Sequence, residues 1–316
     1  MPTMTAIVRN GDQTLSPAQV ERPVPGPTEV LIKTAAAGIN PIDWKIRLNG
    51  DPFGTFDPDA PMVLGWDVAG EVVELGAGVT RFTVGDRVFG MPRFPYPAGA
   101  YAEYVVARSR EVALTPPNIT DTEAAGLPVA ALTAWHAVVD TLNIRRGDRI
   151  LVHAAAGGVG HLAVQIAKHR GAEVWGTASH KNHAALHELG LDHAIDYKTE
   201  KFEEVATSMD AVVDLYGVDE YPARSVKSLK PGGKLVVVPS VGEFPTPEEL
   251  GEADVTATRM LVEPDYASLE RVAEIIEAGA LTVVVADTRP LAQVAELHAI
   301  GEAGGPLGKL VATIGS

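Results

Sequence analysis

Three glycines suited to phosphate binding lie close together near the middle of the chain. Gly157, Gly158 and Gly160 directly follow the apolar run 150–152, and an apolar pattern with helical spacing follows over 162–167. Glycine lets the backbone approach a pyrophosphate, and the N-terminus of a helix offers free N–H groups and a partial positive charge. The order strand, glycine turn, helix therefore predicts a dinucleotide site whose contacts are Ala156, Gly157, Gly158, Val159 and Gly160.

The glycine pattern departs from the usual G-x-G-x-x-G fingerprint at one position. Ala155 stands where the first glycine is expected. A turn that only joins a strand to a helix is the alternative interpretation. The apolar strand before the glycines and the helical pattern after them favour the nucleotide site.

The residues about twenty positions further on indicate which nicotinamide cofactor is used. A carboxylate at the end of the second strand would bind the ribose 2′-hydroxyl of NAD, but this strand, 172–179, ends in Ser179, His180 and Lys181. A hydroxyl beside cationic groups, with no acid between Glu173 and Glu188, suits a 2′-phosphate. We therefore expect NADP(H); the alternative is that Lys181 is an ordinary solvated lysine.

Composition excludes several classes of partner. Among 316 residues, 26 basic and 41 acidic side chains give a net charge of −15, which disfavours nucleic acid and anionic membrane surfaces. The chain has no cysteine, which excludes disulfides, thiolate catalysis and every cysteine-ligated zinc site. The sequence has no charged-then-apolar leader and no run of eighteen apolar residues, so we expect a cytoplasmic protein with no membrane partner.

The elements that must position these residues change character along the chain. Up to about 118, short alternating patterns such as 29–34 and 67–74 predict a β-rich region. Beyond it, strands alternate with helical patterns, and this predicts a doubly wound parallel sheet. The predicted strands are 149–153, 172–179, 193–197, 210–217, 234–240 and 256–263. A helix over 267–279, a strand over 282–285, a helix over 291–303 and a strand over 309–314 complete the prediction, and this β-rich tail is expected to return to the first region.

Nine short motifs in a fixed order carry a resemblance to a known family. They are 37–43 (AGINPID), 65–72 (GWDVAGEV), 85–88 (GDRV), 99–104 (GAYAEY), 131–135 (ALTAW), the glycine turn, 196–197 (DY), 230–233 (KPGG) and 308–311 (GKLV). The chain resembles the medium-chain dehydrogenase/reductase superfamily, and within it the zinc-free, zeta-crystallin-like quinone oxidoreductases. The resemblance implies an α/β protein with a GroES-like catalytic domain, 1–118 and 281–316, around an NADP-binding Rossmann domain, 119–280. It also implies an active site in the cleft between the two domains and a homodimer or homotetramer.

Zinc-dependent members of this superfamily hold their metal at positions that look equivalent to Asn40, Trp66 and Asp67. Catalytic zinc needs three good ligands from thiolate, imidazole or carboxylate, and neither asparagine nor tryptophan qualifies. The cysteine cluster of the structural zinc is also absent. His180, His183 and His187 share a helical spacing that can bind zinc, but we expect a solvated helix face there. The sequence therefore predicts no metal.

The resemblance also implies where the cofactor lies. Asn40, Thr133 and the glycine turn would lie near the nicotinamide, and Lys181 and Tyr197 near the adenosine phosphate; simple packing is the alternative role for Tyr197. The residues expected to line the far side of the nicotinamide are Gly217, Val218, Val238 and Ser240.

The proton donor is left open, because Trp44 and Lys45 stand where many relatives have a tyrosine after the Asn-Pro motif. Besides Asn40, the catalytic candidates are Asp43, Lys45 and Tyr101, and solvent is the alternative donor. Asp43 could equally cap a helix and Tyr101 could simply pack. The aromatic and proline-rich segments 51–56 and 91–98 suit the walls of a pocket for a flat apolar acceptor.

Without zinc, the enzyme has no Lewis acid to stabilise the alkoxide formed from an isolated ketone. We therefore expect an acceptor that spreads the incoming negative charge by conjugation. The leading prediction is an NADPH-dependent quinone oxidoreductase. An NADPH-dependent alkene reductase acting on enones or enals is the first alternative. A non-catalytic, crystallin-like NADPH-binding protein is the second.

Overall fold

The computed structural model describes residues 2–57, 59–218, 220–238 and 244–315. Contacts divide the chain into two compact units. Unit 1 contains residues 1–132, 263–279 and 283–316, and unit 2 contains residues 133–262 and 280–282. No helix in the described ranges is long and apolar enough to cross a membrane. The GroES-like and Rossmann-like fold class is confirmed in the two units.

Unit 2 is built on a parallel sheet whose six strands in the described residues run in the order β10-β9-β8-β11-β12-β13. The strands are β8 (Arg149–Val152), β9 (Glu173–Ala178), β10 (His193–Asp196), β11 (Met209–Asp214), β12 (Leu229–Val237) and β13 (Thr256–Arg259). All six predicted strands are confirmed. The order reverses next to β8, so the turn after β8 lies where doubly wound sheets bind their ligands.

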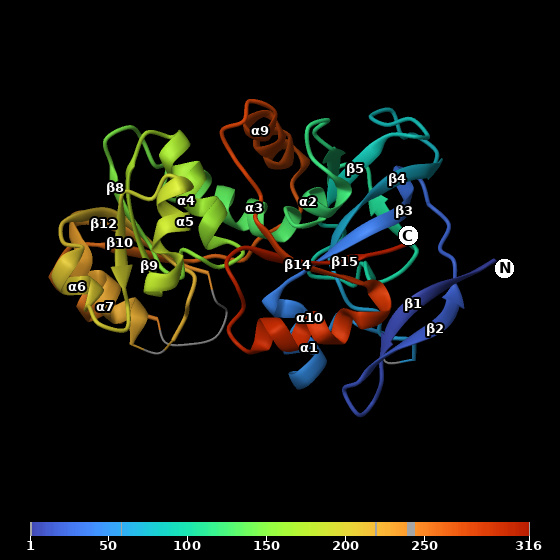
Figure 1. Cartoon of the computed structure of the whole chain (residues 1–316), viewed down its shortest axis with the longest axis horizontal. Helices are drawn as coiled ribbons and strands as arrows, with labels where there is room; N and C mark the ends of the chain where they lie inside the picture. The colour runs from blue at the N-terminus through green and yellow to red at the C-terminus, as the bar shows by residue number, and fades with distance from the viewer. Residues whose placement is uncertain (1, 58, 219, 239–243, 316) are drawn as a thin grey trace. The chain divides into compact units, whose positions relative to one another are not determined.

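Helices cover this sheet because alternate residues of each strand face opposite sides. Leu151, Val212 and Leu235 share one core cluster with Phe202 and Val226. The helices of unit 2 are α4 (Gly160–His169), α5 (His183–Glu188), α6 (Phe202–Val205), α7 (Tyr221–Ser228) and α8 (Pro247–Ala253), with a π-helix, η1 (His136–Thr141), and a 3-10 turn, η2 (His180–Asn182). Phe202 and Val226 lie on α6 and α7, while α4 packs on β8 and β9 (Figure 1).

Unit 1 is β-rich and draws on both ends of the chain. Its larger sheet runs β14-β15-β3-β4-β5-β7, with β6 paired to β3, and β1 with β2 forms a separate antiparallel pair. The strands are β1 (Thr3–Arg9), β2 (Leu15–Glu21), β3 (Glu29–Ile39), β4 (Asp67–Leu75), β5 (Arg87–Gly90), β6 (Tyr104–Arg108), β7 (Val112–Leu114), β14 (Val285–Pro290) and β15 (Lys309–Thr313). The expected return of the tail to the first region is thus confirmed, because β15 pairs with β3.

The helices of unit 1 include two segments that the sequence prediction assigned to the nucleotide domain, 119–132 and 263–279. Helix α2 packs on β3 and β4, helix α9 packs on β7, and Asn118 Nδ2 donates to the Ile276 carbonyl. The helices are α1 (Pro41–Asn49), α2 (Asp121–Ala125), α3 (Pro128–Trp135), which crosses the division after Leu132, α9 (Tyr266–Glu277) and α10 (Val294–Glu302), preceded by a 3-10 turn, η3 (Leu291–Gln293).

One predicted strand was wrong in position. Residues 282–285 were expected to pair, but β14 starts only at Val285. Thr282 is held instead by a side chain, since its N–H donates to Gln165 Oε1 at 2.8 Å and its carbonyl accepts from Gln165 Nε2 at 2.9 Å. A glutamine on α4 thereby replaces the strand partner.

Candidate functional site

The glycine turn after β8 is too tight for a larger residue at its last position. A Cβ on Gly160 would lie 2.2 Å from the Ala154 carbonyl oxygen. Ala154 itself has a positive φ of 49°, and the Gly157 N–H donates to its carbonyl oxygen at 2.8 Å. The backbone therefore folds back on itself directly before α4, and only glycine fits at position 160.

The same turn presents unused backbone donors. Among the described residues, no hydrogen-bond acceptor meets the N–H groups of Ala156, Gly158, Val159 and Gly160. No side chain caps α4, so the positive end of its dipole adds to these donors. This arrangement fits an anionic pyrophosphate, the group for which the sequence proposed these residues.

The end of β9 has the polarity expected for a phosphate. Ser179 is half-buried, and His180 and Lys181 are exposed. Within the part of the chain that the structure describes, Lys181 forms no ion pair, so its ammonium is available to a ligand. The three residues lie at the carboxyl end of β9, next to the turn after β8.

The other proposed cofactor residues follow the same edge of the sheet. Tyr197 comes directly after β10 and is 48% exposed, and Val218 is 46% exposed after β11. Gly217 is buried with φ 69°, and its N–H donates to Asp214 Oδ1 at 3.1 Å. Val238 is half-buried after β12. Thr133 is buried in α3, and Ser240 lies outside the described residues.

The three histidines after β9 do not form a metal centre. His183 Nε2 lies 3.2 Å from the Ala178 carbonyl oxygen, and His187 Nδ1 lies 2.7 Å from the Leu191 carbonyl oxygen. His180 packs edge-on against His183 with their ring centroids 5.1 Å apart. Across the described ranges, no group of three His, Cys, Asp or Glu is placed to hold a metal ion.

His153 opens the glycine turn, and the sequence did not single it out. Its Nδ1 lies 3.2 Å from Thr177 Oγ1 and its Nε2 lies 3.0 Å from Ser225 Oγ. Its ring packs on Phe202 and Tyr221, with centroid distances of 4.4 and 5.1 Å. Burial lowers the pKa of His153 to about 3, so the imidazole is neutral and fixes the base of the turn to β9 and α7.

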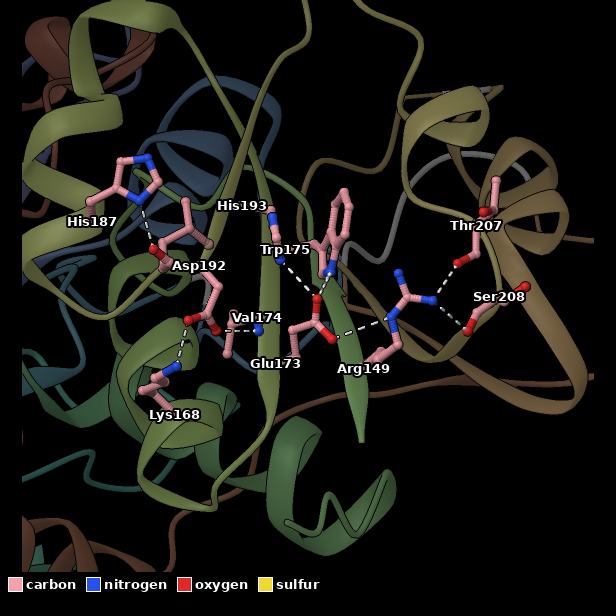
Figure 2. A network of polar contacts seen from close by, with 11 residues as sticks. Arg149, Lys168, Glu173, Val174, Trp175, His187, Asp192, His193, Thr207 and Ser208 are labelled. Atoms are coloured by element: carbon pink, nitrogen blue, oxygen red, sulfur yellow. Dashed lines mark hydrogen bonds and ion pairs between the residues drawn. The ribbon is translucent and has the colours of Figure 1, made fainter. Parts of the chain in front are cut away.

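The amino ends of the same strands carry a different polar network (Figure 2). Glu173 Oε1 lies 2.8 Å from His193 Nε2, and Glu173 Oε2 lies 3.5 Å from Arg149 Nε. The His193 ring stacks on Trp175 at a centroid distance of 4.0 Å. These contacts join the starts of β8, β9 and β10, at the opposite edge from the turn, and they stabilise the sheet rather than a cofactor site.

Strand register in unit 1 brings three polar residues together. Gly38 pairs with Asp67 across β3 and β4, and Ile39 pairs with Leu310 across β3 and β15. Asn40 follows β3 directly, and Asp67 and Lys309 are the first residues of their strands. The side chains of Asn40, Asp67 and Lys309 are therefore forced into one buried cluster.

In this cluster, the polar groups satisfy one another. Asn40 Nδ2 donates to Asp67 Oδ2 at 2.8 Å, and Lys309 Nζ donates to Asn40 Oδ1 and to the Ile39 carbonyl oxygen, the latter at 3.0 Å. Lys309 Nζ also pairs with Asp67 Oδ2 at 3.4 Å, and the Val129 N–H donates to Asp67 Oδ1 at 2.7 Å. Burial raises the pKa of Asp67, and the Lys309 ammonium opposes that rise.

The positions where zinc enzymes hold their metal are thus committed to other contacts. Trp66 is fully buried, and its Nε1 donates to the Tyr96 carbonyl oxygen at 2.8 Å. Its ring meets Phe94 and Phe56 with centroid distances of 5.5 and 6.2 Å. An indole offers no metal-ligating atom, and the Lys309 ammonium already contacts Asn40 and Asp67, so these residues do not fit a zinc ion.

One of the predicted catalytic residues, Tyr101, meets a histidine that sequence reasoning missed. Tyr101 Oη lies 3.0 Å from His298 Nε2, and both side chains are fully buried. Burial raises the pKa of Tyr101 well above 10, with a further contribution from nearby Asp43, and burial lowers the pKa of His298 to about 3. Gly65 makes room for the phenol, since a Cβ there would lie 2.5 Å from the Tyr101 ring.

Asp43 lies in the first turn of α1, where it caps the helix. Its Oδ2 accepts the Asn40 N–H at 2.7 Å, and the Tyr101 hydroxyl lies close enough to the carboxyl to oppose the effect of burial on its pKa. Burial raises the pKa of Asp43 from 3.8 to about 7, with a smaller contribution from Asp67. Lys45, by contrast, is exposed on the same helix.

The two aromatic segments that the sequence proposed as pocket walls do line one cavity in unit 1. Its volume is about 1000 Å³, and Phe56, Phe94 and Tyr96 are among its lining residues. Thr55 Oγ1 donates to the Pro95 carbonyl oxygen at 3.0 Å, which ties one segment to the other. The hydrogen bond from Trp66 to Tyr96 supports this wall from behind. The cavity has the size of a small-molecule site.

Comparison with known proteins agrees with both units. Residues 26–117 match the family model of the alcohol dehydrogenase GroES-like domain, and residues 189–311 match that of the zinc-binding dehydrogenases. The chain is 34% identical to a chloroplastic quinone-oxidoreductase homolog of Spinacia oleracea, over 90% of this chain and 89% of the relative. It is 35% identical to a chloroplastic NADPH-dependent alkenal/one oxidoreductase of Arabidopsis thaliana, over 90% and 71% of the two chains.

A solved structure matches this chain over nearly its whole length. The quinone oxidoreductase from Coxiella burnetii superposes with a TM-score of 0.90 at 33% identity, and the match covers 99% of this chain and 100% of that one. The Arabidopsis relative is named as NADPH-dependent, and the open turn after β8 suits a nicotinamide cofactor. The chain therefore belongs to the zinc-free, quinone oxidoreductase-like family of medium-chain dehydrogenases and reductases.

Proposed function

We propose that this protein is a zinc-independent, NADPH-dependent oxidoreductase that transfers a hydride to a quinone. The observation that carries the proposal is the buried cluster of Asn40, Asp67 and Lys309. By the resemblance, Asn40 and Asp67 stand where zinc-dependent members of the superfamily are expected to hold their metal. Reduction of an isolated ketone needs a Lewis acid or a strong proton donor for the developing alkoxide. A quinone spreads that charge by conjugation, so a few hydrogen bonds suffice.

In this proposal, the cofactor binds at the carboxyl edge of the sheet in unit 2. NADPH, when bound, supplies a hydride from C4 of its nicotinamide ring. The free N–H groups after β8 would hold the pyrophosphate, and Ser179 and Lys181 would hold the 2′-phosphate. The chain's share of the chemistry is then to bind, to orient and to exclude water.

The proton that completes the reduction comes from solvent in this proposal. Asp43 and Tyr101 are fully buried, and the raised pKa of Tyr101 makes its hydroxyl a weaker acid. Lys45 is exposed and does not line the cavity of unit 1. We therefore assign Asp43 and Tyr101 to the support of α1 and of the Asn40 segment.

Reduction of an alkene in an enone or enal is the second candidate. The Arabidopsis relative is named as an alkenal/one oxidoreductase, and the same charge argument applies to an α,β-unsaturated carbonyl. The aromatic residues lining the cavity, Phe56 and Phe94, suit either flat acceptor. Substrate profiling separates the two candidates.

The test follows the oxidation of NADPH and of NADH with a quinone panel and an enone panel, after treatment with a chelator. We expect activity to survive the chelator, NADPH to be preferred, and the quinones to react faster. Loss of activity with the chelator would contradict the proposal, and faster reaction of the enones would select the alkene reductase.

The cofactor assignment has its own test. Lys181→Ala should raise the KM for NADPH about tenfold and leave that for NADH unchanged, because only NADPH carries the 2′-phosphate. Lys198→Ala, which removes a lysine between β10 and α6, is the matched control. Equal effects of Lys181→Ala on both cofactors would show that the lysine does not contact the phosphate.

A further inference from the structure

The cavity of unit 1 carries four charged side chains besides its aromatic lining: Asp57, Arg93, Arg108 and Glu111. Two of them compensate each other. Glu111 is buried, its Oε2 accepts the Arg108 N–H at 3.0 Å, and its Oε1 lies 3.8 Å from Arg108 Nη1. The charge of Arg108 is therefore already balanced inside the cavity.

Arg93 shares the buried Glu111 carboxylate with Arg108, because both guanidiniums act on its charge. Within the described ranges, its guanidinium makes no ion pair and no hydrogen bond, and its side chain is exposed at the cavity. The remaining carboxylate of the lining, Asp57, accepts the Asp59 N–H at 2.9 Å and forms no ion pair in the same ranges. Two guanidiniums thus face one buried carboxylate, and the exposed guanidinium of Arg93, which forms no ion pair in the described ranges, is the one in excess at the cavity.

The backbone at Arg93 supports a functional interpretation. Its φ is 63°, in the left-handed region that residues other than glycine rarely adopt, and its carbonyl oxygen accepts the Tyr96 N–H at 2.8 Å. The loop is held in place by the bond from Trp66 to Tyr96. Strained conformations of this kind persist where the surrounding structure enforces them, so the loop holds Arg93 in a fixed position.

We propose that the cavity binds an acceptor that carries a carboxylate on its conjugated body, and that Arg93 pairs with this carboxylate. This inference rests on the proposed function and narrows its substrate class. A guanidinium binds a carboxylate through two parallel hydrogen bonds, and Phe56 and Phe94 would contact the flat body. A cavity of about 1000 Å³ has room for both parts of such a molecule.

The test compares a conjugated keto acid with its uncharged methyl ester, 4-oxopent-2-enoic acid and methyl 4-oxopent-2-enoate, as acceptors of hydride from NADPH. Arg93→Gln should lower kcat/KM for the acid by about 10- to 100-fold, mainly through KM, and leave the ester within about twofold. Arg93→Lys keeps the charge and should retain part of the preference. Arg271→Gln, an exposed arginine on α9, is the matched control and should change neither acceptor.

Two outcomes would overturn the inference. Equal losses for acid and ester would mean that Arg93 only maintains the loop, and no loss for either would mean that the carboxylate does not contact it. Calorimetric binding of the acid to the wild type and to Arg93→Gln is measured in parallel. If the wild type binds NADPH but reduces neither the quinone panel nor these two enones, the proposed function fails, and the calorimetric difference still decides whether Arg93 binds the carboxylate.

Discussion

At the turn after β8, the N–H groups of residues 156 and 158–160 meet no acceptor in the described residues, whereas in unit 1 the side chains of Asn40 and Asp67 have all their polar atoms engaged. Both regions lie at strand ends, and for both the resemblance led us to expect a ligand or metal position. The first offers donors to a ligand, and the second has used its groups on Lys309. Unsatisfied polar groups at a strand end thus indicate binding, while satisfied ones indicate a structural replacement.

Removal of the buried Lys309 ammonium should give the largest loss in the free energy of unfolding. Lys309→Met leaves the buried Asp67 carboxylate without its ion pair, and we expect a loss of about 3–5 kcal/mol in the free energy of unfolding, measured in urea. Adding Asp67→Asn should recover part of this loss, because the charge that needs a partner is then gone. Lys168→Met, which breaks the exposed pair with Asp192, should cost less than about 1 kcal/mol. Similar losses of unfolding free energy for Lys309→Met and Lys168→Met would show that the buried ion pair is no more important for stability than the exposed one.

Burial of Asp43 should make the stability of the protein depend on pH. Its pKa is about 7 in the folded state and 3.8 ordinarily, so the folded protein keeps a proton that the unfolded chain releases between pH 4 and 7. This carboxyl therefore lowers stability as the pH rises through that window, by a few kcal/mol in total.

Asp43→Asn isolates this contribution, because His153 and His298, with pKa values of about 3, act in the opposite direction between pH 3 and 6.5. The free energy of unfolding of the wild type minus that of the variant should fall from pH 4 to pH 7. A difference independent of pH would show that Asp43 is ionised throughout. The groups nearest to Asp43 are the Asn40 N–H, Asp67, Tyr101 and Lys309.

At the open region, one methyl group should weaken cofactor binding. Gly160→Ala places a Cβ 2.2 Å from the Ala154 carbonyl oxygen, and we expect the Kd for NADPH to rise about 10- to 100-fold. Alanine is otherwise favoured over glycine in a helix by about 1 kcal/mol, so a loss of affinity must come from the distorted turn. Gly157→Ala, whose Cβ would lie 3.2 Å from the same oxygen, is the milder control. The Kd values are measured by fluorescence titration with NADPH. Equal Kd values for the two variants would contradict the close approach of residue 160 to the Ala154 carbonyl oxygen.

The smallest expected effect on the free energy of unfolding concerns Trp66, which by the resemblance stands at a position where zinc-dependent members are expected to have a metal ligand. Trp66→Phe removes the hydrogen bond to Tyr96 and should cost about 1 kcal/mol in the free energy of unfolding. The loop 91–98 loses its support, so the KM for the acceptor should rise a few-fold while the KM for NADPH is unchanged. A change in the KM for NADPH alone would place the role of Trp66 outside the cavity.

Much of the fold could be predicted because its signals are local. The six strands of unit 2 are short buried apolar runs, and the positive φ of 71° at Gly279 agrees with the predicted end of helix α9. The partners in unit 1 could not be predicted, since Lys309 meets Asn40 across 269 residues and His298 meets Tyr101 across 197. Strand register brings Lys309 to Asn40, and the packing of helix α10 on β14 and β15 brings His298 to Tyr101. A lysine that opens a buried C-terminal strand was the one available signal.

The contact between Lys309 and Asn40 also sets an order of events during synthesis. Asn40 and Asp67 leave the ribosome before unit 2, but their cation arrives only with β15, 269 residues after Asn40. At about 5–20 residues per second, this interval is roughly 10–50 s. Residues 133–262 of unit 2 emerge within it and can fold first. The nascent chain must meanwhile keep the Asp67 carboxylate hydrated, so the core of unit 1 closes only after β15 has emerged.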